Sequence, residues 1–87
     1  MPRASQAEDY RRFLARLRAA REEAGLSQVE VASQLGKPQS FVSKCESGER
    51  RVDVVELAAF AEVYGVSLDR FVNNGPARMP TSRRKKR

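Results

Sequence analysis

The 87-residue sequence contains no histidine, no tryptophan and only one cysteine. A single cysteine excludes an internal disulfide, and the lack of histidine removes the usual ligand of a zinc site and the usual base of a catalytic triad. We therefore expect a protein that is not an enzyme and that has no metal site and no cofactor.

Long apolar runs are also absent. No stretch approaches the roughly 18 consecutive apolar residues that a membrane span requires, and the N-terminal MPRASQAEDYRR lacks the hydrophobic core of a signal peptide. We expect a cytoplasmic protein with no membrane partner. The composition, 40% apolar and 32% charged, is typical of a small globular domain, and its abundant Ala, Leu, Arg and Glu favour helices.

The excess positive charge lies at the C-terminal end. Residues 1–75 hold 11 Lys or Arg and 11 Asp or Glu, whereas residues 76–87 hold six basic residues and no acidic one. Like charges repel one another and cannot form a core, so we expect one domain over 1–75 and a flexible, disordered basic tail over 76–87. This tail is either a sequence-independent contact for phosphate groups or a solubilising extension or cloning remnant.

Capping and stop signals divide the domain into five helices, so the expected fold is an all-α, compact five-helix bundle. S-x-x-E capping boxes begin at Ser5 and Ser27, and glycines end the amphipathic runs that follow them. Proline is tolerated in a first helical turn, so we expect Pro38 to begin the third helix, over about 38–47, after a second helix over about 28–35. Asp53 and Ser67 are expected to open the last two helices. The residues expected to face inward are Phe13, Leu14, Leu17, Ala20, Arg21, Ala24, Val31, Ala32, Leu35, Val42, Cys45, Val54, Leu57, Ala58, Phe60, Ala61 and Tyr64.

The third expected helix has one polar face. At about 100° per residue, its polar side chains at positions 39, 40, 43 and 44 fall within an arc of roughly 140°, while Val42 and Cys45 point the other way. This face is either ordinary solvated surface or a set of side chains that bind a ligand. The lone Cys45 is either a small buried hydrophobic residue or a redox switch.

Two short helices joined by a glycine-containing turn are typical of a helix-turn-helix. Here the turn contains Gly36, and the small Ala32 suits a close helix crossing. The segment GLSQVEVASQLGKPQSFVSKCESGERRVDVVELAAFAEVYGVSLDRF resembles the lambda-repressor/Cro-like helix-turn-helix family, often called the XRE family, and residues 8–71 match its helix order. The resemblance implies that the 28–35 helix lies across a DNA backbone and that the 38–47 helix enters the major groove as the recognition helix.

The resemblance also implies roles for individual residues. Gln28 is expected to contact a phosphate and to support the recognition helix, and Arg50 and Arg51 to contact phosphates. Arg21 and Glu46 are expected to form a structural ion pair. The residues expected to contact base edges are Gln39, Ser40, Ser43 and Lys44.

The expected partner is double-stranded DNA, bound by a homodimer at a near-palindromic operator, with the protein acting as a repressor or autoregulator of transcription. Leu68, Phe71 and Val72 are either core residues or a dimer contact. The alternative function is that of an antitoxin, or another protein-interaction partner, whose DNA binding is secondary.

Overall fold

The computed structural model describes residues 6–72, and within them it contains five helices and no strand. This confirms the all-α fold class. Two features expected from the sequence, the capping box that begins at Ser5 and the basic tail over 76–87, lie outside the described residues. The helices are α1 (Gln6–Glu23), α2 (Gln28–Leu35), α3 (Gln39–Ser47), α4 (Val54–Tyr64) and α5 (Asp69–Val72).

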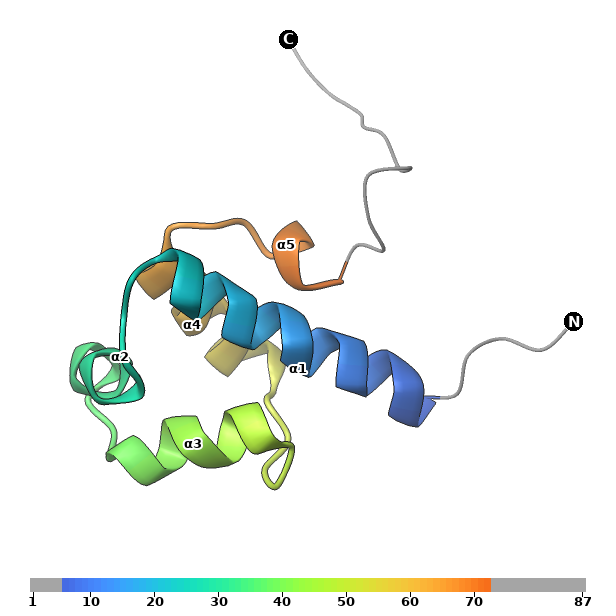
Figure 1. The fold of residues 1–87 in the computed structure, drawn as a ribbon, viewed down its shortest axis with the longest axis horizontal. Helices are drawn as coiled ribbons and strands as arrows, with labels where there is room; N and C mark the ends of the chain where they lie inside the picture. The colour runs from blue at the N-terminus through green and yellow to red at the C-terminus, as the bar shows by residue number, and fades with distance from the viewer. Residues whose placement is uncertain (1–5, 73–87) are drawn as a thin grey trace, which may run out of the picture.

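The long helix α1 organises the bundle. It crosses the middle of the view in Figure 1, with α3 below it and α5 above it. α1 packs against both α3 and α5, while α2 packs against α3 and α4. α3 therefore has one face against the bundle and one face directed away from it.

Side-chain and glycine caps fix the ends of α2. The Ser27 hydroxyl accepts a hydrogen bond from the Glu30 amide at 3.1 Å, and the Glu30 carboxylate accepts one from the Ser27 amide at 2.8 Å, which is the expected capping box. Gly36 ends the helix in the left-handed conformation, with φ of 69°. This conformation is strained for a residue with a Cβ but not for glycine. The chain can therefore reverse into α3 within a few residues.

Pro38 precedes the first turn of α3 and does not form part of it. It is the N-cap of α3, in an extended conformation with φ of −71° and ψ of 156°, and the first helical residue is Gln39. The fixed φ of proline suits both an extended residue and a first helical turn, so the ring alone does not decide between them. α3 therefore begins at Gln39, one residue after the start expected at about residue 38.

The core takes buried residues from every helix. Phe60 and Phe71 are its largest fully buried side chains, and Phe41 covers its edge, with its ring stacked 6.3 Å from the ring of Phe60. Each large apolar side chain removed from water contributes about 1.5–3 kcal/mol. The buried apolar residues are Leu17, Ala20, Val31, Ala32, Val42, Cys45, Phe60, Ala61, Tyr64 and Phe71.

Three residues expected to face inward are exposed instead: Ala24, Val54 and Ala58. Ala24 lies beyond the last residue of α1. α4 has the sequence VVELAAFAEVY, which is apolar at nearly every position, so spacing could not identify its buried face. Within residues 6–72 no helix is both long enough and apolar enough to cross a membrane.

Candidate nucleic-acid interface

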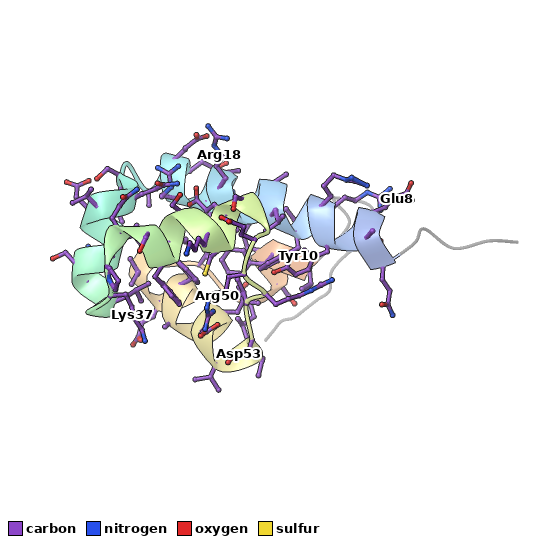
Figure 2. All side chains as sticks on the ribbon, turned by 90° about the horizontal axis from the view of Figure 1, so that it is seen from below. Glu8, Tyr10, Arg18, Lys37, Arg50 and Asp53 are labelled. Carbon is purple, nitrogen blue, oxygen red and sulfur yellow. The ribbon has the colours of Figure 1, made fainter. Side chains whose placement is uncertain are left out.

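The outward face of α3 carries the polar side chains that the sequence places together. Gln39, Ser40 and Lys44 are exposed and Ser43 is partly buried, whereas Val42 and Cys45 are fully buried on the opposite side. Figure 2 looks onto the side of the molecule where α3 lies, with Lys37 near the start of the helix and the Arg50 side chain alongside it, toward α4. The four expected base-contacting residues are therefore brought together on one face.

An ion pair behind α3 ties it to α1. Arg21 Nε lies 2.7 Å from Glu46 Oε2, and Arg21 Nη2 lies 3.2 Å from Glu46 Oε1. The two side chains are only 12% and 5% exposed, so water screens this pair weakly. The hydrogen bonding that Arg21 donates to Glu46 is the main reason that the pKa of Arg21 is raised. A third Arg21 nitrogen donates to the Leu26 carbonyl at 2.9 Å, which fixes the turn before α2.

Two glutamines continue this network to the surface. Gln28 Nε2 donates to Glu46 Oε1 at 3.0 Å, and Gln39 Nε2 donates to Gln28 Oε1 at 2.8 Å. A carboxylate can only accept hydrogen bonds, so Gln28 must direct its NH₂ group toward Glu46 and its carbonyl toward Gln39. Gln39 must then direct its own NH₂ group toward Gln28. The ion pair thereby determines which way the Gln39 amide faces.

The two arginines of the loop after α3 have different partners. Arg50 forms a bidentate ion pair with Glu56, at 2.7 and 2.8 Å, and its guanidinium carbon lies 4.8 Å from the centre of the Phe41 ring. The positive charge of Arg50 is thus balanced within the chain. Arg50 therefore holds the loop against α3 and α4, and its expected phosphate contact stays a prediction.

Arg51 is exposed, and it forms none of the ion pairs found among residues 6–72. Its guanidinium carbon lies 4.2 Å from the centre of the Tyr10 ring. Arg51 is therefore placed as a cation at the surface, beside the end of α3.

Sequence reasoning missed two residues of this region, Glu56 and Tyr10. The D-x-x-E pattern at Asp53 could have revealed Glu56, whose side chain completes a second capping box. No local signal could have revealed the role of Tyr10, because its contacts with the loop are with residues more than 40 positions later.

Cys45 behaves as a core residue. Its side chain is fully buried, and burial raises the pKa of its thiol, so the reactive thiolate is disfavoured. Burial supports the first of the two readings of this residue, a small hydrophobic side chain that fills the inner face of α3.

Phe71 is fully buried in the bundle, so it is a core residue in this structure, whereas Leu68 and Val72 are 42% and 60% exposed. Val72 also lines a pocket of about 270 Å³ with Phe13, Phe71 and three polar residues of α1, namely Asp9, Arg12 and Arg16. Only Leu68 and Val72 of the three residues therefore remain available for a contact between subunits.

The arrangement of α2 and α3, with a capped first helix, a tight turn and an outward polar face on the second, defines a helix-turn-helix domain. The family model described as "Helix-turn-helix domain" matches residues 12–71, and the chain belongs to this family. A solved structure described as an XRE-family like protein from Pseudomonas syringae pv. tomato str. DC3000 is 45% identical, with a TM-score of 0.69, and the match covers 71% of this chain and 76% of that one. The protein is thus an XRE-like helix-turn-helix protein, and this membership agrees with the expectation that it is not an enzyme.

A second relative is the HTH-type transcriptional regulator PrpR of Mycobacterium tuberculosis (strain ATCC 25618 / H37Rv). It is 35% identical over 65 residues, which are 75% of this chain but 13% of that protein. The similarity therefore concerns one segment of a much longer regulator.

Proposed function

We propose that the protein is a transcriptional regulator that binds double-stranded DNA sequence-specifically through α3. The observation that carries this proposal is the chain of hydrogen bonds from the buried Arg21–Glu46 pair through Gln28 to Gln39. An ordinary solvated face needs no such support, because exposed side chains are hydrated in any orientation. Side chains that read base edges gain affinity from being held in advance.

The network leaves Gln39 with the groups that adenine requires. A bidentate contact to adenine needs an acceptor for the N6 amino group and a donor for N7. Gln39 uses one hydrogen of Nε2 on Gln28, so a second hydrogen and the whole Oε1 atom stay available. Lys44 can donate to guanine O6 or N7, whereas Ser40 and Ser43 discriminate little because a hydroxyl both donates and accepts.

Backbone contacts come from a different set of residues. Gln28 has a second Nε2 hydrogen that is suited to a phosphate oxygen, and Arg51 forms none of the ion pairs found among residues 6–72. The basic tail is proposed to add sequence-independent phosphate contacts. Such contacts fix the register of the protein on DNA without reading sequence.

We further propose a homodimer with two recognition helices about 34 Å apart, one turn of DNA, on a near-palindromic operator. Residues 1–75 have no net charge, so one copy has little electrostatic attraction to DNA, and two copies with two tails have more. Leu68 and Val72 are the proposed subunit contact. Repression or autoregulation, through occupancy of a promoter, and a cytoplasmic location remain predictions.

Selection of bound sequences from random duplex DNA tests this function. The proposal predicts an enriched motif made of two related half-sites about one helical turn apart. Enrichment of a single half-site would contradict the homodimer but would still support base recognition by α3. A selected pool without any enriched motif would contradict sequence-specific binding. Co-purification with an equimolar small protein would favour the antitoxin alternative.

A further inference from the structure

Tyr10, in the second turn of α1, contacts two successive residues of the loop that follows α3. Its hydroxyl accepts a hydrogen bond from the Val52 amide at 3.1 Å, and its ring lies 4.2 Å from the guanidinium carbon of Arg51. The ring is itself held by Phe13, 5.2 Å away between ring centres. A partly buried side chain of the first helix thus fixes both the backbone and a cationic side chain of a loop 42 residues away.

The contact leaves Arg51 chemically free to bind an anion. A guanidinium that lies over an aromatic ring uses its flat face, while its N–H donors point outward in its plane. These in-plane donors match two oxygens of a phosphate. The neighbouring Arg50 provides the contrast, because Glu56 occupies two of its nitrogens at 2.7 and 2.8 Å.

An Arg51 side chain that is already held in place before DNA binds should increase the affinity for DNA. An exposed arginine samples many rotamers and loses them when it binds, whereas an arginine already held by a ring loses fewer. The Val52 hydrogen bond adds to this by fixing the backbone from which the Arg51 side chain extends.

We propose that Tyr10 is a positioning residue for DNA-backbone binding, and that it holds Arg51 toward a phosphate next to the bases that α3 reads. α1 thereby supports DNA binding through a residue that does not itself touch DNA. This inference rests on the proposed function and concerns how one of its phosphate contacts is made.

A double-mutant cycle tests the inference, with Tyr10→Leu, Arg51→Ala and the combined variant measured on a selected operator and on random duplex. Tyr10→Leu is expected to weaken binding to both by the same factor, about 2- to 12-fold, the range for ordering one flexible side chain. Arg51→Ala is expected to reduce the slope of log affinity against log salt by about 0.9, the value of one phosphate contact. In the Arg51→Ala background, Tyr10→Leu is expected to have no further effect.

Controls separate positioning from folding. Tyr10→Phe keeps the ring and loses only the Val52 hydrogen bond, so it is expected to retain most of the salt slope. Arg18→Ala removes a charge of α1 that is paired with Glu22, and it is expected to leave the slope unchanged. The sequence motif selected by each variant is expected to match that of the wild type, because phosphate contacts carry no sequence information.

Two outcomes would overturn the inference. If the losses of Tyr10→Leu and Arg51→Ala are additive while the wild type binds normally, Tyr10 acts independently of Arg51 and only this inference fails. If the wild-type protein binds no duplex, the proposed function fails, and the inference fails with it.

Discussion

Replacement of both members of the Arg21–Glu46 pair is expected to leave the stability of the fold nearly unchanged while it reduces the preference for particular DNA bases. Glu46→Leu alone leaves a guanidinium that is 12% exposed without its carboxylate, and breaking a buried pair in this way typically costs about 3–5 kcal/mol. A domain of this size has a total stability of only about 4–13 kcal/mol. The single variant should therefore lose a large share of the free energy of unfolding, and its urea midpoint should fall well below that of the wild type.

The double variant Arg21→Met, Glu46→Leu removes both charges and fills similar volume. Apolar replacement of a complete buried pair is often neutral or stabilising by about 1–4 kcal/mol, so the free energy of unfolding should return to near the wild-type value. Gln28 nevertheless loses the acceptor that orients it, and Gln39 is then free to rotate its amide. Preference for adenine at the Gln39 position should fall, while binding to random duplex should change little.

Urea unfolding followed by circular dichroism measures the first effect, and competition between operator and base-substituted operator measures the second. A double variant that is stable and keeps the full adenine preference would refute the claim that the ion pair orients Gln39. A Glu46→Leu variant as stable as the wild type would refute the energetic part of the argument.

Three further predictions concern Lys44, the Arg50–Glu56 pair and the tail. Lys44→Ala should lower operator affinity by about 1–3 kcal/mol and affinity for random duplex much less, and equal losses in a binding titration would contradict a base contact. Hydrogen bonding from Arg50 lowers the pKa of Glu56 in the folded protein. The ion pair therefore stabilises the fold fully above the pKa of Glu56 in the unfolded chain, near 4.5, and this stabilisation is lost as the pH falls through the lower pKa of the folded state. The stability difference between wild type and Glu56→Gln should therefore shrink on acidification below about pH 4.5, and a difference that stays constant down to pH 2 would argue against the pair. Truncation after Gly75 should weaken binding to all sequences and flatten its salt dependence, and an unchanged slope would remove the tail from the interface.

Local chemistry made most of the helix ends predictable. Ser27, Gly36 and Asp53 carry signals that act within three or four residues, and the structure has the caps that they indicate. The polar face of α3 was predictable for the same reason, since helical periodicity alone places its residues together.

Contacts between distant parts of the chain were harder to predict. The resemblance implied the Arg21–Glu46 pair, but only the structure shows how Gln28 links it to Gln39. Arg50 lies beside Arg51 in the sequence, but Arg50 pairs with Glu56, six residues later, whereas Arg51 lies over the ring of Tyr10. Sequence position could not distinguish the two arginines, because their environments are set by tertiary packing.

The central claim is that α3 reads base edges with Gln39 held in place from behind. Replacement of the adenine opposite Gln39 in the selected operator by 7-deazaadenine removes the N7 acceptor and leaves the rest of the base unchanged, so it tests this claim most directly. The wild-type protein should lose roughly 2- to 12-fold in affinity, the value of one hydrogen bond, and Gln39→Ala should lose nothing further. An equal loss in both proteins, or no loss in the wild type, would contradict the account.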